Sequence, residues 1–419
     1  MITVAPTAAS RGYPLIVHSH LRWDFVWQRP QQILSRSGER HPVLFVEEPV
    51  FVDDSASGSL DVTAVSVGVH RVVPRLPKQL ASSYDDAAEA VRTLVRHLVG
   101  ARGALGGMFA HPVQWFYTPM PAPVMIDAFG ERAIVYDCMD ELTQFRFAPP
   151  ELAQRERFLM TRADVVFTGG RQLYESKTRH HPNVHFFGCG VDADHFERAR
   201  RTETSVAPEL RELAHPVLGY FGVVDERLDY ALIGRLADCF AAGSVVLVGP
   251  TAKVDASELP HRANIHWLGQ RPYERLPEYV KGFDVCLMPF ALNDATQYIN
   301  PTKTLEYMAA GKPIVSTAVP DVVRNFAPVV RVADSAAGFI DAVSQALTPD
   351  ESRIEAGLAR ARAATWESIV AGMEDLIGAA IRARRELPAG RRAAATGRRA
   401  HAVGALRGDP PADGEVSVA

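Results

Sequence analysis

The chain has 419 residues, of which 47% are hydrophobic and 22% are charged, and its formal net charge is −4 at pH 7. Because this length exceeds the size at which one hydrophobic core keeps growing, we expect two domains of roughly 200 residues each. The charge balance gives no electrostatic indication of nucleic acid as a partner. The four cysteines form no C-x-x-C pair, which argues against a zinc site and against a disulfide framework.

The scattered cysteines fit a reducing cytoplasm, and the apolar residues give no indication of export or of a membrane span. Residues 1–12 lack the basic start and long apolar run of an export signal, and no later run approaches the roughly 20 apolar residues of a transmembrane helix. Residues 387–419 are rich in Ala, Gly, Arg and Pro without periodicity, so a disordered basic tail is predicted there. The arginines of this tail could attract anionic lipid at the inner face of the membrane, and a solvated tail is the simpler interpretation.

The first half opens with a strand, a helix and a second strand. Residues Tyr13–His18 and His41–Val46 are apolar and strand-like, and Pro30 suits the start of the intervening helix. This order predicts a Rossmann-like opening. The G-x-G-x-x-G loop of dinucleotide-binding proteins is missing from it, so no cofactor is expected.

Candidate cleft residues follow the first strand. His18 and His20 stand at its carboxyl end, where open parallel sheets bind their ligands. Arg29 either contacts a substrate anion or is purely structural. Three aromatic residues of the same segment are expected to be half core and half cleft wall: Trp23, Phe25 and Trp27.

Acidic residues end a later strand of the first half. Residues Arg132–Asp140 form an apolar stretch whose end exposes Asp137, Asp140 and Glu141 near the same sheet edge. This cluster is the best acid/base candidate of the first half. The alternative is that these carboxylates only cap the following helix.

The second half begins after a linker-like stretch. Residues Arg198–His215 are charged and poor in apolar residues, as interdomain linkers are. From Pro216 onward, apolar strands alternate again with helical segments. A second Rossmann-like domain is therefore predicted.

The most informative stretch of the second half is YINPTKTLEYMAAGKPIVST, residues 298–317. Asn300 is suited to cap a helix, Pro301 to its first position, and Gly311 to its left-handed end. The apolar residues after Pro313 predict a buried strand. The stretch therefore predicts a loop, a short helix and a strand.

Lys303 and Glu306 give this helix a chemical role. A lysine in the first turn opposes the helix dipole unless an anion binds there. Together with the Thr302 hydroxyl and free backbone N–H groups, Lys303 could cradle a diphosphate, while Glu306 could accept two ribose hydroxyls. The stretch is thus predicted to be a nucleoside diphosphate site. The alternative is an exposed Lys–Glu surface pair worth roughly 0.2 to 0.5 kcal/mol.

The segment NPTKTLEYMAAGKPIVST resembles the nucleotide-sugar signature of retaining glycosyltransferases with two facing Rossmann-like domains, the GT-B architecture. It is most similar to bacterial cell-envelope polysaccharide enzymes such as the teichuronic acid biosynthesis glycosyltransferases. The resemblance implies that Glu306 holds the donor ribose and that Lys303 and Arg227 hold its diphosphate, with no metal ion required. Many members carry an E-x7-E pair. Here Tyr298 stands at the first glutamate's place, so Tyr298 is assigned to the donor side without that glutamate's sugar contacts.

The resemblance also bears on the acidic cluster of the first half. In the family, the strand at this point often ends in a histidine followed by an aspartate that lies beside the reacting sugar. Met139 occupies the histidine's place and Asp140 the aspartate's. The resemblance therefore implies a catalytic-site role for Asp140 and denies this chain the usual histidine.

These expectations give an α/β fold with two Rossmann-like domains facing across a cleft. The predicted bounds are 1–205 for an acceptor-side domain, 206–365 for a nucleotide-sugar domain, and 366–386 for a helix that crosses back. The predicted reaction transfers a sugar from a nucleoside diphosphate sugar, with uracil as the expected base, to a glycan or lipid-linked acceptor. Retention of configuration and independence of metal are expected.

Two other functions stay open. A nucleotide-sugar epimerase of the same architecture could use Asp137, Asp140 and the N-terminal histidines as acid/base groups. A non-catalytic scaffold is suggested by Met139 and Tyr298, which replace two residues that contact sugar in the family. Release of nucleoside diphosphate that depends on an acceptor would separate a transferase from both.

Overall fold

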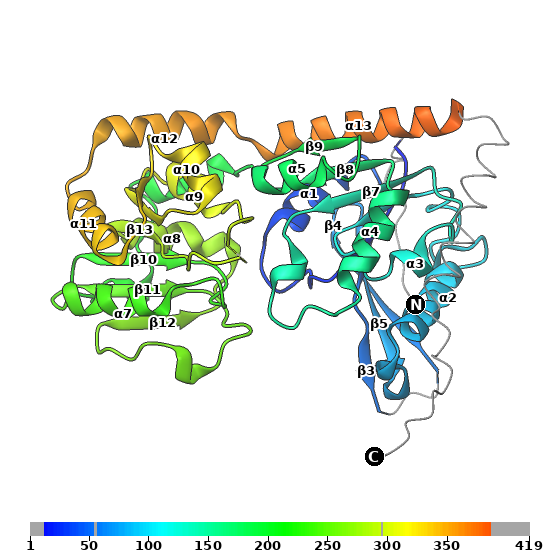
Figure 1. Ribbon diagram of the computed structural model, residues 1–419, viewed down its shortest axis with the longest axis horizontal. Helices are drawn as coiled ribbons and strands as arrows, with labels where there is room; N and C mark the ends of the chain where they lie inside the picture. The colour runs from blue at the N-terminus through cyan, green and yellow to red at the C-terminus, as the bar shows by residue number, and fades with distance from the viewer. Residues whose placement is uncertain (1–11, 54–56, 295, 387–419) are drawn as a thin grey trace, which may run out of the picture.

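The computed structural model describes residues 12–53, 57–294 and 296–386. Two α/β units lie side by side, and two consecutive helices run along the top of both (Figure 1). The predicted fold class, two Rossmann-like domains that face each other, is confirmed. Residues 387–419, for which a disordered basic tail is predicted, lie outside the described residues.

The first unit is built on a sheet that has nine strands within the described residues, in the order β3-β5-β2-β1-β6-β7-β8-β9. Strand β4 pairs with β5 in the antiparallel sense, and the other pairs are parallel. The strands are β1 (Leu15–Ser19), β2 (Val43–Glu47), β3 (Val50–Val52), β4 (Ser59–Ser66), β5 (Val69–Pro77), β6 (Val113–Phe116), β7 (Ala133–Cys138), β8 (Val165–Thr168) and β9 (Val184–Phe186). The helices of this unit are α1 (Arg29–Ser37), α2 (Tyr84–Val99), α3 (Ala122–Met125), α4 (Leu152–Arg162) and α5 (Arg171–Lys177).

The second unit is built on a parallel sheet with the order β12-β11-β10-β13-β14-β15 in the described part of the chain. Its strands are β10 (Val217–Phe221), β11 (Ser244–Val248), β12 (Ile265–Gly269), β13 (Val285–Met288), β14 (Ile314–Thr317) and β15 (Arg331–Ala333). The helices from the start of this unit to the end of the described chain are α6 (Ala193–Glu197), α7 (Tyr230–Cys239), α8 (Leu276–Gly282), α9 (Lys303–Ala309), α10 (Pro320–Phe326), α11 (Ala336–Ala346), α12 (Glu351–Ala363) and α13 (Trp366–Glu386).

The central strands are apolar along their whole length. Strands β1 and β2 of the first sheet, and β10 and β11 of the second, are buried at every position. Continuous burial means that helices cover both faces, as parallel sheets require. Two apolar clusters therefore flank the first sheet, and a third surrounds the second sheet.

The chain passes between the two units at two adjacent points. The backbone N–H of Val191 donates to the carbonyl of Ala364 at 2.8 Å, and Val191 forms a parallel bridge with Thr365. Gly190 fits this crossing because a Cβ atom there would lie 2.8 Å from the backbone nitrogen of Trp366. Val191 and Phe196 are already part of the second core. The two connections thus cross between the units side by side.

Helix α13 returns the chain to the first unit. It packs against α1, β7 and β8, and it lies along the top of the first unit in Figure 1. Its buried face includes Val370, Met373 and Ile377, which belong to the same apolar cluster as β1. This burial ties the end of the described chain to the first core.

We expect the substitution Ile377→Ala to lower the free energy of unfolding by about 2–5 kcal/mol, because it opens a cavity beneath α13. Ile377 is 1% exposed. Urea denaturation followed by circular dichroism measures this difference. The matched control is Asp375→Ala on the exposed face of the same helix, which should change the stability by less than about 0.5 kcal/mol. Equal effects of the two substitutions would contradict the docking of α13.

Candidate functional site

A cavity of about 390 Å³ lies between the two units. Residues that follow β7 and β8 line it on one side, and residues that follow β10, β11 and β12 line it on the other. Both sheets therefore direct their carboxyl ends at the same space, which is where open parallel sheets bind ligands.

Helix α9 brings the predicted diphosphate residues to this cavity. It begins at Lys303, so the prediction that Asn300 caps it and that Pro301 opens it is wrong. The reason is that the Asn300 amide instead donates to the carbonyl of Gly169 in the first unit, at 3.0 Å. The predicted end is confirmed, since Gly311 has φ +67° directly after the C-cap residue.

Lys303 points its ammonium into the cavity. Its Nζ lies 6.0 Å from the ring centroid of Phe221, and no hydrogen bond or ion pair of this side chain exists among the described residues. Gly222, with φ +145°, makes room for it, because a Cβ atom there would lie 2.0 Å from Cε of Lys303. Burial lowers the pKa of Lys303, against an opposing effect of Glu306. An anion in the cavity would relieve this unpaired charge.

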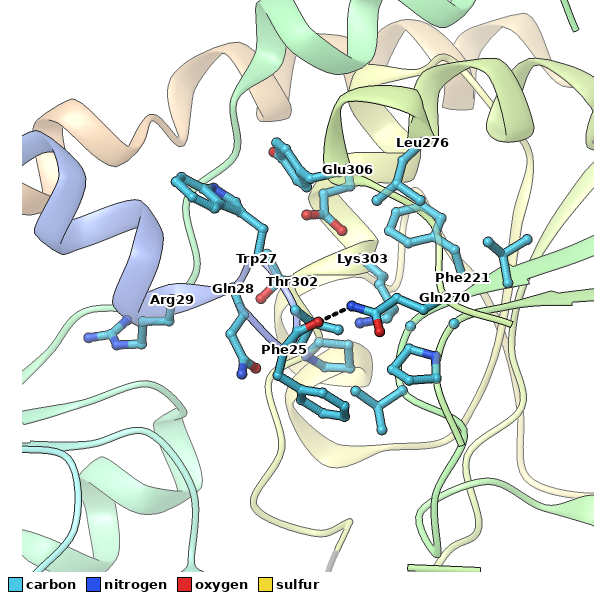
Figure 2. Close-up of a pocket in the computed structure, with 18 of the residues that line it drawn as sticks. Phe25, Trp27, Gln28, Arg29, Phe221, Gln270, Leu276, Thr302, Lys303 and Glu306 are labelled. Carbon is cyan, nitrogen blue, oxygen red and sulfur yellow. Dashed lines mark hydrogen bonds between the residues drawn. The ribbon is translucent and has the colours of Figure 1, made fainter. Parts of the chain in front are cut away.

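Glu306 lies one turn further along α9 and is only 6% exposed. Figure 2 shows Lys303 and Glu306 projecting from the same helix into the space bordered by Phe25 and Gln270. Burial raises the pKa of Glu306 to about 7, and the positive charge of Lys303 opposes this shift. The interpretation of Lys303 and Glu306 as an exposed surface pair is therefore excluded. Both side chains line the cavity.

Arg227 reaches the same cavity from the loop after β10. Its guanidinium is held by Asp225, with 2.9 Å from Nε to Oδ1 and 2.6 Å from Nη2 to Oδ2. Burial disfavours the charge, yet the neighbouring Asp225 raises the pKa of Arg227 above its ordinary value. The structure thus brings Arg227 and Lys303 together, as expected. The partner Asp225 was not expected from the sequence.

Asp140 lines the cavity from the first unit, just after β7. Burial raises the pKa of Asp140 to about 6, the positive charge of Arg227 lowers it, and Asp225 adds to the rise. At neutral pH this carboxylate is mostly ionised and still close enough to its pKa to exchange a proton. Asp140 therefore faces the cations of the second unit across the cavity.

Arg29 lines the cavity but has its donors occupied. Its Nη2 lies 3.0 Å from Oδ1 of Asp137, and its Nη1 donates to the carbonyl of Phe187 at 2.9 Å. The side chains of Arg29 and Asp137 are 4% and 0% exposed. Arg29 was expected either to contact a substrate anion or to be purely structural, and its buried pair with Asp137 fits the structural role. Asp137 is likewise removed from the acid/base candidates.

Three other predicted residues do not line the cavity. His18 is buried, stacks on Phe116, and shares a 2.8 Å hydrogen bond between its Nε2 and Oε1 of Gln114. Burial lowers the pKa of both His18 and His20 to about 4, so both are neutral at pH 7. Tyr298 packs against an apolar cluster of the first sheet. Because Tyr298 lies outside the residues that line the cavity, its position gives no support to the predicted donor-side role, which stays a prediction.

The segment from Trp23 to Gln28 contributes more of the cavity than the sequence suggested. The Gln270 side chain, after β12, donates to the Phe25 carbonyl across the cavity (Figure 2). The rings of Trp27 and Tyr273 lie 6.0 Å apart. Trp23 itself is buried against Phe45, so the expected division into core and cleft wall is confirmed. The contact of Gln270 across the units had no signal in the sequence.

Thr302 completes the donor-side group that was predicted. Its hydroxyl lines the cavity and donates to Sγ of Cys189 at 3.1 Å.

In the described ranges, no group of three or more His, Cys, Asp or Glu side chains is arranged to hold a metal ion. The described helices also include none that is both long and apolar enough to cross a membrane.

Solved structures share this two-domain architecture. The chain is similar to a trehalose-6-phosphate structure from E. coli bound with UDP-2-fluoro glucose, with a TM-score of 0.62 and 13% identity, over 87% of this chain and 98% of that one. A sucrose-phosphate synthase from Thermosynechococcus elongatus matches with a TM-score of 0.62 and 15% identity, over 89% and 100% of the two chains. Two parallel α/β domains that face a shared cavity define the GT-B architecture.

Two sequence comparisons also match this chain, one of them within the second unit. Residues 215–349 match the family described as glycosyl transferases group 1. The chain is also 26% identical over 233 residues to TuaH of Bacillus subtilis (strain 168), whose name is that of a teichuronic acid biosynthesis glycosyltransferase. This similarity covers 51% of this chain and 58% of the relative. Part of the second unit is therefore similar to group 1 glycosyl transferases, and the fold as a whole is the GT-B architecture.

The raised pKa of Glu306 predicts a pH-dependent effect of Glu306→Gln on stability. The folded protein holds this proton up to about pH 7 and the unfolded chain loses it near 4.5, so ionisation destabilises the fold as the pH rises between these values. We expect the variant to gain stability over wild type, by up to about 3 kcal/mol, as the pH rises through this window, with no further change above it.

Urea unfolding at several pH values between 4.5 and 8 measures this difference. The exposed Glu355→Gln substitution is the control for the loss of a negative charge. A difference between Glu306→Gln and wild type that does not vary with pH would contradict the buried state of this carboxyl group.

Proposed function

We propose that the protein is a glycosyltransferase that transfers a sugar from a UDP-sugar to a glycan or lipid-linked acceptor, with retention and without a metal ion. The observation that supports this most is that Lys303 and Glu306 line one cavity, in which the Lys303 ammonium has no hydrogen-bond partner among the described residues. A half-buried ammonium beside a buried carboxyl group suits a ligand that carries both negative charge and hydroxyl groups. A nucleoside diphosphate carries both.

The proposed roles follow from position. Lys303 and Arg227 bind the diphosphate, whose negative charge grows as the bond to the sugar breaks, and two cations in a dry cavity stabilise that charge by several kcal/mol. Glu306 accepts hydroxyl hydrogens of the ribose. Asp140, on the opposite side, contacts the sugar or the acceptor. The Thr302 hydroxyl is a further diphosphate contact.

The identity of the substrates rests on the comparisons. The E. coli structure is bound with UDP-2-fluoro glucose, and an α,α-trehalose-phosphate synthase (UDP-forming) from Burkholderia xenovorans is in complex with glucose-6-phosphate. These support a UDP-sugar donor and a hydroxyl-bearing sugar as acceptor. The name of TuaH supports an acceptor in cell-envelope polysaccharide synthesis. A cytoplasmic location with peripheral contact to the inner face of the membrane completes the proposal.

An epimerase is less well supported than a transferase. It would need acid and base groups on both sides of the sugar, and two of the candidates for that work are engaged elsewhere. Asp137 is bound to Arg29, and His18 is bound to Gln114. Asp140 is thus left without the histidine or the second aspartate that such a mechanism would use.

UDP at about 100 times its dissociation constant should stabilise the wild-type protein by roughly 2.7 kcal/mol, whereas Lys303→Ala should lose most of this effect. Thermal melting with UDP, GDP and ADP measures it. The matched control is Lys78→Ala, which removes an exposed lysine that pairs with Asp53 in the first unit and should keep the full shift. A shift by GDP or ADP alone would overturn the choice of uracil, and no shift by any nucleotide would favour the non-catalytic scaffold.

Asp140→Asn should lower the rate of UDP release from UDP-sugars by at least about 100-fold, since it removes the ionised carboxylate that faces the sugar. The melting shift produced by UDP should stay as in wild type, because the nucleotide contacts are in the second unit. Release of UDP in the presence of candidate glycan acceptors, followed by a coupled assay, measures the rate. Unchanged turnover would exclude Asp140 from the reaction.

A further inference from the structure

A buried charge cluster lies behind Asp140. Nζ of Lys177, at the end of α5, lies 2.7 Å from both Oε2 of Glu141 and Oε1 of Glu156. The Tyr136 hydroxyl donates to the same Glu156 oxygen at 2.7 Å, and Thr143 donates to Oε1 of Glu141 at 2.7 Å. The side chain of Lys177 is only 5% exposed. The loop that begins with Asp140 and Glu141 is therefore held by Lys177 through Glu141, and by the Cys138 thiol, which donates to the Asp140 carbonyl at 3.5 Å.

The opposite end of α5 is held by the second unit. The carboxylate of Asp321, on α10, accepts the backbone N–H of Arg171 at 2.6 Å, and Asp321 is completely buried. Gly170 allows this approach, because a Cβ atom there would lie 3.1 Å from Oδ2 of Asp321 and 2.8 Å from the carbonyl of Tyr298. A residue of the second unit thus caps a helix of the first.

Helix α5 is short enough to act as a rigid connector. Its seven residues span about 10 Å, with the contact to Asp321 at Arg171 and the contacts to Glu141 and Glu156 at Lys177. Resting on the proposed function, we propose that Lys177 is a positioning residue for Asp140, and that Asp321 links this position to the arrangement of the two units. The groups that make the link are Asp321, α5, Lys177 and Glu141, in this order.

The chemistry of the cluster explains why it can position a loop. The carboxylates Glu141 and Glu156 share one ammonium, so neither can leave without exposing a buried charge. Burial disfavours the charge of Lys177, yet its neighbours Cys138, Glu156 and Glu141 raise its pKa above the ordinary value, and it stays charged. The backbone on either side of Glu141 is consequently fixed, and Asp140 with it. When the units separate and Asp321 leaves Arg171, α5 is free to shift and the loop loses its anchor.

Hydrogen exchange followed by mass spectrometry on the full chain tests this link without any substrate. Asp321→Ala, a change in the second unit, should speed exchange at least about threefold in peptides that cover residues 139–147, in addition to residues 171–174. Lys177→Met should speed exchange in residues 139–147 to the same or a greater extent. The double variant should match Lys177→Met alone, because both substitutions act on one connection.

The control is Arg324→Ala, which removes the ion pair with Glu175, another contact between α10 and α5. It should leave residues 139–147 unchanged. If Lys177→Met does not fold, Glu141→Gln serves in its place, since it keeps the shape and weakens the ion pair. Confinement of the Asp321→Ala effect to residues 171–174, or additive effects in the double variant, would overturn the proposal.

Activity separates this proposal from the proposed function. In a working transferase, Lys177→Met should lower UDP release at least about tenfold, leave the UDP melting shift unchanged, and have no further effect in an Asp140→Asn background. A lysine that only stabilises the fold would lower activity in both backgrounds. If exchange responds as expected and no UDP-sugar is turned over, the link stands and the proposed function fails.

Discussion

The site depends on the placement of Lys303 and Glu306 side by side on α9, with the lysine half-buried and the carboxyl group buried. Such a pair is costly unless something polar occupies the cavity, because both charges lose their hydration. The backbone is shaped for it: Gly222 leaves its Cβ position open for the lysine stem, and Phe221 turns its ring toward the ammonium. These features at the carboxyl end of β10 suit a ligand that carries both negative charge and hydroxyl groups.

The rest of the site completes this pair from across the cavity. Arg227 forms an ion pair with Asp225, so the positive potential that it adds in the cavity is smaller than that of Lys303. Asp140 comes from the other sheet, and it meets the second unit only when the two units lie close together. The contact of Gln270 with the Phe25 carbonyl likewise joins the units over the cavity. The complete site therefore needs residues of both units, which are joined by the two adjacent connections at Val191 and Thr365.

The local part of this arrangement could be predicted from the sequence, and the long-range part could not. The spacing of Lys303 and Glu306 places them on one helix face, which needs only the period of the helix. Asn300 could not be assigned correctly, because its partner lies 131 residues away and outcompetes the role of a cap. Arg29 was left between two roles for the same reason, since Asp137 is 108 residues distant. Sequence periodicity contains no information on which distant groups meet, and the family resemblance supplied the facing domains.

Calorimetric titration of UDP at pH 7, in two buffers with different heats of ionisation, tests the central claim most directly. Because the pKa of Glu306 is about 7, half of the free protein carries the proton there. Two ribose hydroxyls that each donate to one carboxyl oxygen favour the ionised carboxylate over the protonated form. Wild type is therefore predicted to release roughly half a proton more per bound UDP than Glu306→Gln. Protons that the nucleotide itself gains or loses on binding contribute equally to both proteins, so they cancel when the two values are subtracted. Equal proton release by the two proteins would contradict the assignment of Glu306 to the ribose.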